Sequence, residues 1–429
     1  MLRKRIIFQA LVVSFVIMLA AALPIYAGDE LWYQEYGGEW SAELHDVVQL
    51  SDGGFALLGW IEEPILGGWS AWLIRTNSDG EMIWNKTYDT GGFASDIGYS
   101  LIEVSTGGYL IAGRTAAHAA WMIRTDASGV MVWNSTFEIG GASTAAFCVV
   151  ECSNGEFAVV GDGSFLLKLD SSGNQLWNKT FNTASAEETE TSGILSVAEI
   201  GGGHFILAGY TEGLGAGDGD VWLIRADADG NELWNRTFGG AELDVGYSVI
   251  EVSTGGFAIA AGTSSFQDAG GGWLVRVDGD GNELWNQVYN DTIGFAGLMS
   301  APGGIDVVEC SDGGFALIDR QFSQDPGLGH YDIWLGRTDS DGVLQWHKIF
   351  GDEFEGGDGH ALVELATGGF AVAGWMRSIE EGPTSGLLIV FEDSAPPSEA
   401  PDYTLLIAIG IGGAVILIVI VVYMQKRRN

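Results

Sequence analysis

Short apolar segments separated by glycine-rich turns recur along most of the chain. Residues 99–137 show the unit, which consists of four β-rich segments: YSLIEVS (99–105), GGYLIAGRT (107–115), AWMIRTDASG (120–129) and VMVWNSTF (130–137). These segments are apolar on both faces, so a sheet made from one unit has to be covered by neighbours on both sides. The pattern predicts a radial array of four-stranded sheets, whose strands we call A to D in chain order.

The unit occurs seven times, as shown by the aromatic residue of a GGF-like sequence at the start of strand B. Consecutive copies lie 48 to 58 residues apart, within the range of propeller blades. The sequence therefore predicts an all-β fold, a seven-bladed β-propeller. The aromatic residues are Phe55, Tyr109, Phe157, Phe205, Phe257, Phe315 and Phe370.

The first copy is preceded by an additional strand D. ELWYQEYGG (30–38) matches NELWNRTFGG (231–240), which contains strand D of the fourth copy, whereas the seventh copy (360–393) lacks a strand D. We predict that the N-terminal strand pairs into the seventh blade and closes the ring. Closure of this kind removes the exposed strand edges of an open array.

Two stretches of the repeat resemble a known family. DGDGNELWNQVY (278–289) and GNELWNRTFGGAELDVGYSVIEVSTGGFAIAAGTSS (230–265) resemble the repeat of SBBP-type seven-bladed β-propeller surface proteins of bacteria and archaea. The resemblance extends over about residues 30–393 and implies the propeller fold. It implies no particular ligand, because such propellers serve many roles.

The two ends of the chain differ from the repeat. Residues 1–27 have a basic start, an apolar run and LPIYA at their end, which predicts a secretory signal peptide. Residues 403–424 are 22 residues without a charge, long enough for a transmembrane helix. A propeller ectodomain (28–392) and an acidic, Pro-containing linker (393–402) lie between them, and a basic tail (425–429) follows. The predicted protein spans the cell membrane once, with an extracellular propeller and a cytoplasmic C-terminus.

The composition narrows the possible functions. The net charge of −38 argues against nucleic-acid binding, because few basic groups are available to neutralise phosphates. The six histidines are scattered, without zinc spacing or a nucleophile elbow, so we expect neither an enzyme nor a cofactor. The three cysteines are expected to be small buried apolar residues. They are Cys148, Cys152 and Cys310.

Strand B ends on the face that carries the long connections. The A–B and C–D connections are tight glycine turns, whereas the B–C and D–A connections are long and unlike each other, as recognition loops usually are. One position at the end of strand B varies between blades while its neighbours barely change. We interpret it as a binding position for an extracellular polysaccharide or protein; the alternative is that these side chains pack under their own loops. The candidates are Trp60, Arg114, Tyr210, Arg320 and Trp375.

A near-complete ring of acids lies six residues before the strand B aromatics. One interpretation is a cation site or an anionic channel mouth. The other is structural: each acid pairs with a neighbouring group, such as the basic residue of strand C. The acid position holds Gln49, Glu103, Glu151, Glu199, Glu251, Glu309 and Glu364. The basic position holds Arg75, Arg124, Lys168, Arg225, Arg276 and Arg337.

Two further motifs have a structural and a functional interpretation. The C–D turns, such as DADGN (227–231), resemble calcium loops, but calcium needs six or more oxygen ligands, so we interpret them as hairpin turns. Strand D repeats a Trp-Asn sequence with Thr two residues further on, which predicts N-glycosylation unless the repeat retains the pattern for packing. The sequons are at Asn85, Asn134, Asn178, Asn235 and Asn290.

Together these features predict a membrane-anchored cell-surface propeller that acts as a binding or adhesion module. A structural, glycosylated envelope component is one alternative. A propeller enzyme, such as a quinoprotein or a polysaccharide-active enzyme, is another.

Overall fold

The computed structural model describes residues 31–63, 67–91, 95–139, 144–181, 192–266, 270–289, 305–322, 331–351, 356–377, 382–391, 405–411 and 414–420. The chain divides into two compact units. The first, Glu30–Glu392, contains all of the repeats, and the second takes in both ends of the chain.

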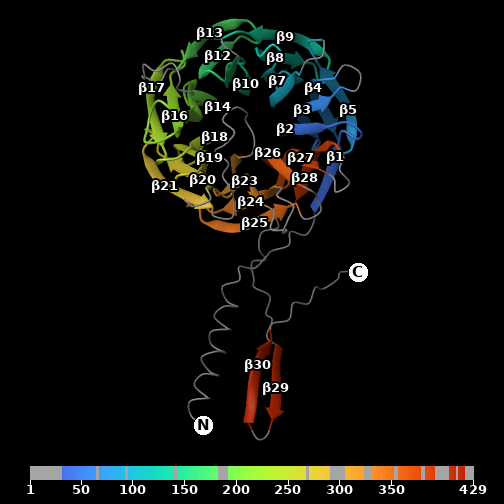
Figure 1. The fold of residues 1–429 in the computed structure, drawn as a ribbon, viewed down its shortest axis with the longest axis vertical. Helices are drawn as coiled ribbons and strands as arrows, with labels where there is room; N and C mark the ends of the chain where they lie inside the picture. The colour runs from blue at the N-terminus through green and yellow to red at the C-terminus, as the bar shows by residue number, and fades with distance from the viewer. Residues whose placement is uncertain are drawn as a thin grey trace. The chain divides into compact units, whose positions relative to one another are not determined.

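In the first unit the described strands form seven antiparallel four-stranded sheets, arranged as a ring (Figure 1). Strand A of each blade is nearest the centre of the ring, and strand D forms the outer wall. The predicted seven-bladed propeller is therefore confirmed.

Six of the blades follow the order A to D along the chain. Blade 1 consists of β2 (Ala42–Gln49), β3 (Phe55–Glu62), β4 (Trp69–Thr76) and β5 (Met82–Tyr88). Blade 2 consists of β6 (Ile97–Glu103), β7 (Tyr109–Arg114), β8 (Ala120–Thr125) and β9 (Met131–Phe137). Blade 3 consists of β10 (Ala146–Glu151), β11 (Phe157–Gly161), β12 (Phe165–Leu169) and β13 (Gln175–Thr180).

The next three blades repeat this order. Blade 4 consists of β14 (Ser192–Ile200), β15 (His204–Thr211), β16 (Asp220–Ala226) and β17 (Glu232–Phe238). Blade 5 consists of β18 (Asp244–Glu251), β19 (Phe257–Thr263), β20 (Gly271–Val277) and β21 (Glu283–Tyr289). Blade 6 consists of β22 (Asp306–Glu309), β23 (Phe315–Phe322), β24 (Tyr331–Thr338) and β25 (Leu344–Phe350).

Blade 7 is built from both ends of the repeat region. Its strands A to C are β26 (Gly357–Glu364), β27 (Phe370–Arg377) and β28 (Thr384–Phe391), and β1 (Leu31–Tyr36) pairs antiparallel with β28 as strand D. The Tyr36 hydroxyl also donates a hydrogen bond of 2.6 Å to the Gly80 carbonyl of blade 1. The predicted closure by the N-terminal strand is confirmed.

The hydrophobic core lies between adjacent blades. The cluster between blades 4 and 5, for example, joins Ile206 and Leu223 to Ile259 and Val275. Strand C carries a buried tryptophan facing this layer in five blades, and Phe165 replaces it in blade 3. Because each sheet is covered on both faces, strands B and C read as continuous apolar runs rather than alternating ones. The tryptophans are Trp72, Trp121, Trp222, Trp273 and Trp334.

A tryptophan–glycine contact joins adjacent blades at six of the seven junctions, as seen in the described residues. Gly230, in the C–D turn of blade 4, has a φ of +76°, and a Cβ at this position would lie 2.5 Å from the Trp177 ring of blade 3. Glycine is therefore required twice, by the backbone conformation and by the close ring. The pairs are Trp32–Gly80, Trp84–Gly129, Trp133–Gly173, Trp177–Gly230, Trp234–Gly281 and Trp285–Gly342.

Replacing Gly230 by Ala should therefore lower the free energy of unfolding by about 2–4 kcal/mol, as the sum of backbone strain and displacement of the Trp177 ring. Urea denaturation followed by tryptophan fluorescence measures the change. Gly255→Ala is the matched control, because Gly255 also has a positive φ (+94°) but no atom lies within 4 Å of the added Cβ. It should cost only about 1–2 kcal/mol. Equal losses in the two variants would contradict the inter-blade contact.

The second unit contains one described element, a hairpin of β29 (Leu405–Ile411) and β30 (Ala414–Ile420). The transmembrane helix predicted for residues 403–424 is not found there, and no helix among the described residues is long and apolar enough to cross a membrane. Isoleucine and valine make up five of the seven residues of β30, and isoleucine three of the seven in β29; β-branched residues favour strands. The predicted signal peptide (1–27), linker (393–402) and basic tail (425–429) lie outside the described residues.

Candidate functional site

The innermost strands line a central channel through a repeated β-bulge. In six blades the described part of strand A shifts register by one residue, which turns the bulged side chain toward the centre. The bulged residues and those that follow them enclose a cavity of about 130 Å³. The bulged residues are His45, Tyr99, Phe147, Leu195, Tyr247 and His360.

Blades 7 and 1 carry the same set of residue types around this bulge. In both blades an acid lies two residues before a bulged histidine, and the acid pairs across the ladder with the tryptophan that ends strand B. The other blades have neither an acid nor a histidine at these strand A positions. Since blades 7 and 1 meet where the ring closes, the two sets are adjacent. We call them the closure site, which consists of Glu43, His45, Trp60, Asp358, His360 and Trp375.

The two histidines bridge three blades. His360 Nδ1 lies 3.0 Å from the Leu44 carbonyl of blade 1, and His45 Nδ1 lies 2.9 Å from the Gly98 carbonyl of blade 2. A carbonyl only accepts, so both Nδ1 atoms carry the hydrogen and both Nε2 atoms point elsewhere. The two imidazole rings are 5.1 Å apart between centroids.

The Nε2 atoms face carboxylates. His360 Nε2 lies 3.4 Å from Asp358 Oδ2, which also binds Arg320 Nη2 at 2.9 Å. Burial by itself would lower the pKa of His360, but the hydrogen bond and charge of Asp358 outweigh it and raise the pKa above its usual value. Asp358 Oδ1 is buried and has no hydrogen-bond partner among the described residues.

Aromatic rings flank these polar groups. Trp60 is only 7% exposed and stacks on Trp69, which is 37% exposed, at a centroid distance of 4.5 Å and an interplanar angle of 25°. Trp60 thus packs beneath Trp69, which agrees with the alternative that these side chains pack under their own loops. The accessible ring is that of Trp69. Trp375 is partly exposed.

The other predicted binding residues divide into two groups. Arg320 joins the closure site through its ion pair with Asp358. Arg114 and Tyr210 belong to blades 2 and 4, and the charge of Asp162 in blade 3 acts on both. Burial, with the charges of Asp162 and Glu212, raises the pKa of Tyr210 to about 12. Arg114 and Tyr210 thus share the charge of Asp162 and belong to blades other than 7 and 1.

The acids of the ring were expected to pair with strand C bases, but they hydrogen-bond to the A–B turn of the preceding blade. Glu309 of blade 6 accepts hydrogen bonds from the Ser253 backbone N–H (2.7 Å) and hydroxyl (2.6 Å) in the A–B turn of blade 5. The same inter-blade contact occurs at Glu151, Glu199, Glu364 and Gln49. The hydrogen bonds of these acids thus go to the turn of the preceding blade, and the expected strand C bases take part through charge alone: Glu151 acts on Arg124 and Glu309 on Arg276.

Replacing Glu309 by Gln should lower the free energy of unfolding by about 1–2 kcal/mol, because two charge-assisted hydrogen bonds are weakened. Thermal unfolding at neutral pH measures the loss. Ser253→Ala removes only the hydroxyl bond and should cost less. An unchanged melting temperature in Glu309→Gln would rule out the structural role of the acid ring.

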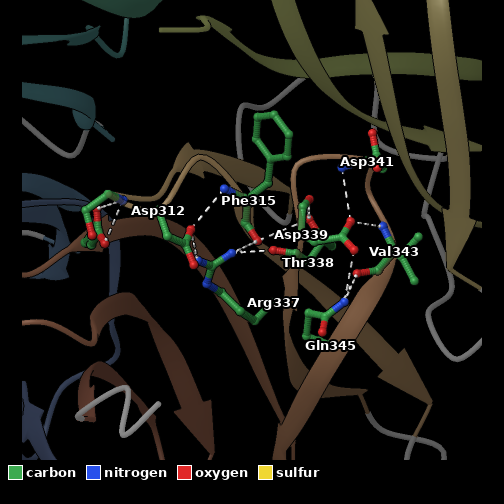
Figure 2. Close-up of polar contacts among 11 residues, drawn as sticks. Asp312, Phe315, Arg337, Thr338, Asp339, Asp341, Val343 and Gln345 are labelled. Atoms are coloured by element: carbon green, nitrogen blue, oxygen red, sulfur yellow. Dashed lines mark hydrogen bonds and ion pairs between the residues drawn. The ribbon is translucent and has the colours of Figure 1, made fainter. Parts of the chain in front are cut away.

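The strand C bases instead hold the A–B turn of their own blade. Figure 2 shows this for Arg337, which binds the carboxylate of Asp312 and the carbonyl oxygen of Thr338. Lys168 likewise contacts Cys152 and Glu156 of its own A–B turn. Arg225 is the exception, because it donates a hydrogen bond of 2.9 Å to the Gly279 carbonyl of blade 5.

The aspartates of the C–D turns serve their own turns. Asp339 Oδ1 accepts hydrogen bonds from the backbone N–H groups of Asp341 and Val343 at 3.0 and 2.9 Å (Figure 2). Asp126, Asp170, Asp227 and Asp278 repeat this geometry. Hairpin chemistry accounts for the motif, and the described residues contain no group of three or more acidic, histidine or cysteine side chains suited to a metal ion.

Four of the sequon asparagines lie on the outer strands. Asn85, Asn134 and Asn178 are exposed, Asn235 is partly exposed, and Asn290 lies outside the described residues. The Asn85 side-chain oxygen accepts a hydrogen bond of 3.2 Å from the Trp72 indole, and Asn286, which is not in a sequon, accepts the same bond from Trp273. The asparagine therefore has a packing role even without a glycan.

Comparison with known proteins shows the fold. No protein-family model and no curated protein matches the chain. YCF48 bound to D1 peptide is similar, with a TM-score of 0.54 and 10% identity over 89% of this chain and 100% of that one. A catalytically inactive virginiamycin B lyase from Staphylococcus aureus with quinupristin gives 0.51 and 12% over 84% and 99%. BamB from Moraxella catarrhalis gives 0.47 and 11% over 86% and 100%.

The closure site was only partly visible in the sequence. Trp60 and Trp375 were recognised because they share a variable position, but Glu43, His45, Asp358 and His360 were not. Their signal was the acid-x-His spacing in strand A of the first and last copies, which the other copies lack.

Proposed function

We propose that this chain is a membrane-anchored cell-surface propeller that binds an extracellular ligand through the face carrying its long connections. The observation that supports this most directly is the closure site, where blades 7 and 1 repeat the same acid, histidine and tryptophan. The fold alone does not need this set, because the other blades form the same strands without it.

The chemistry of the closure site suits recognition. Binding sites combine aromatic surface with a few placed polar groups, and tryptophan and arginine are enriched among residues that contribute most to binding. Trp69 and Trp375 supply the rings, Arg320 a cation, and Asp358 a buried acceptor without a partner among the described residues. Such a set favours binding over catalysis, and we propose no enzymatic role.

A protein or peptide ligand is the preferred class. YCF48, which has a similar fold, is bound to a peptide, and the carboxylates of the buried Asp358 and the partly buried Glu43 suit backbone or side-chain N–H donors. A polysaccharide is the second class, because tryptophan faces and carboxylates also bind sugars.

The proposed membrane anchoring is supported by the sequence of the two chain ends. An apolar N-terminal run, a 22-residue uncharged segment at 403–424 and the basic residues after it support one span with the propeller outside. The exposed sequons of the outer strands support glycosylation, and a glycosylated structural component of the envelope is the second candidate function. Enzymatic deglycosylation followed by mass measurement of the native protein tests this modification.

The binding proposal is tested by capture with the full-length protein in detergent. Immobilised protein is incubated with envelope fractions left untreated, digested with protease, or oxidised with periodate. Retention that protease abolishes indicates a protein ligand, and retention that periodate abolishes indicates a glycan. No retention from any fraction would contradict a binding role.

A further inference from the structure

Blade 3 differs from the other blades in the pair formed between strand C and the end of strand A. Where the strand C base is arginine in blades 1, 2, 4, 5 and 6, blade 3 has Lys168. Its Nζ lies 2.7 Å from the Cys152 sulfur. Hydrogen bonds from N–H to the smaller oxygen atom already span about 2.7–3.2 Å, so this approach is unusually close for nitrogen and sulfur.

The pair is shielded from solvent and has a base beside it. Lys168 is 4% exposed and Cys152 is 3% exposed. The Glu156 carboxylate lies 3.3 Å from Lys168 Nζ, within reach of a direct proton transfer. Burial raises the pKa of Cys152, although Lys168 partly opposes this. Amine and thiol are therefore held together, away from competing water.

Blade 6 provides an internal contrast. It has Cys310 at the position of Cys152, but Arg337 at the position of Lys168. Arg337 is directed to Asp312 and to turn carbonyl oxygens (Figure 2). A guanidinium stays protonated and is a poor nucleophile, whereas a lysine amine becomes reactive once it loses its proton. The reactive combination therefore belongs to blade 3.

We propose that Cys152 and Lys168 form a covalent Sγ–O–Nζ cross-link when the protein meets dioxygen. After Glu156 accepts the ammonium proton, the thiol, the amine and one O₂ give the cross-link and one water: Cys–SH + H₂N–Lys + O₂ → Cys–S–O–NH–Lys + H₂O. The S–H bond, one N–H bond and the O–O bond break, while an S–O bond, an O–N bond and the two O–H bonds of water form. Sulfur and nitrogen are oxidised while both oxygen atoms are reduced. Thiols outside the cytoplasm meet such oxidising conditions.

The cross-link would join the A–B turn of blade 3 to its strand C, 16 residues further along the chain. Blade 3 has the shortest B–C connection, with only Asp162, Gly163 and Ser164 between β11 and β12. The cross-link would therefore tie two segments of blade 3 together and involve no residue of the closure site. It is independent of ligand binding at the closure site, but its oxidising setting rests on the proposed extracellular location.

The test uses full-length protein purified without oxygen and then divided between anaerobic and oxygenated buffer. In oxygen, peptide mass spectrometry should detect residues 152 and 168 in one linked species that has gained one oxygen and lost two hydrogens. Thiol titration after denaturation should fall from three groups to two, and a thiol reductant should restore the third. Cys310 should stay titratable throughout.

Lys168→Arg is the matched variant, because it installs the pair that blade 6 already accommodates. It should keep all three thiols in oxygen. Three thiols and unlinked peptides in the oxygenated wild type would overturn the proposal, as would a linked species that lacks the added oxygen. Loss of the Cys152 thiol in Lys168→Arg at the wild-type rate would overturn the role of the lysine.

Discussion

Deleting residues 31–36 should abolish most of the stability of the propeller. Without β1, blade 7 loses its outer strand, the β28 edge is exposed, and the Tyr36 bond to Gly80 of blade 1 disappears. The free energy of unfolding of a domain is typically about 5–15 kcal/mol. Loss of the whole strand that joins the two ends of the repeat region should remove the larger part of this free energy. Urea denaturation followed by fluorescence should show a much earlier, less cooperative transition.

Two further experiments separate closure from a general effect of mutation. Glu35→Ala, at an exposed residue on the other side of the same strand, should change stability by no more than about 0.5 kcal/mol. A synthetic peptide with the sequence of residues 30–38 should restore the transition of the deleted chain, because it can add as a strand to the open edge. An unfolding curve identical to that of the wild type would contradict closure by β1.

Replacing Asp46 by Ser should remove a loss of folding stability that the wild type shows as pH rises. Asp46 lies in the channel, where its carboxylate accepts hydrogen bonds of 2.6 Å from the Leu101 N–H and 2.7 Å from the Val47 N–H. Burial, which outweighs these bonds, raises its pKa to about 7. In blade 4 the equivalent position is Ser196, whose hydroxyl oxygen accepts the equivalent inter-blade bond from the Val249 N–H of blade 5. The repeat therefore already uses serine at this position.

The raised pKa determines the direction of the effect. Below about pH 4 the carboxyl is protonated in both states, and the penalty is absent. Between about pH 4 and 7 the unfolded chain releases the proton while the folded chain retains it, so stability falls as pH rises. The wild type should thus lose about 3–4 kcal/mol relative to Asp46→Ser between pH 4 and pH 8. A stability difference that stays constant over this range would contradict the buried carboxyl.

The number of blades and the closing strand were predictable because both are properties of the repeat. The seven strand B aromatics count the blades, and the additional strand at 30–38 has one position left to occupy. Trp60 and Trp375 were recognised for the same reason, as departures from a repeated position.

The rest depended on geometry that the repeat does not display. A bulge in strand A shifts the register by one residue, so the alternation of apolar and polar positions did not show that His45 and His360 face the channel. The partners of Glu309 lie on another blade, some 56 residues away, and only the assembled ring brings them together. Trp69 follows a long connection and matches no repeat position, so a comparison of the seven copies could not predict its stacking on Trp60.

The most direct test of the closure site as the recognition surface compares three full-length proteins for binding to the envelope fraction that the wild type retains. The wild type is set against Trp69→Ala/Trp375→Ala, and against Phe266→Ala, which removes an exposed aromatic ring from blade 5. The double variant should bind about 100-fold more weakly or worse, whereas Phe266→Ala should stay within about twofold. Wild-type affinity in the double variant, together with loss in Phe266→Ala, would place recognition on another part of the ring.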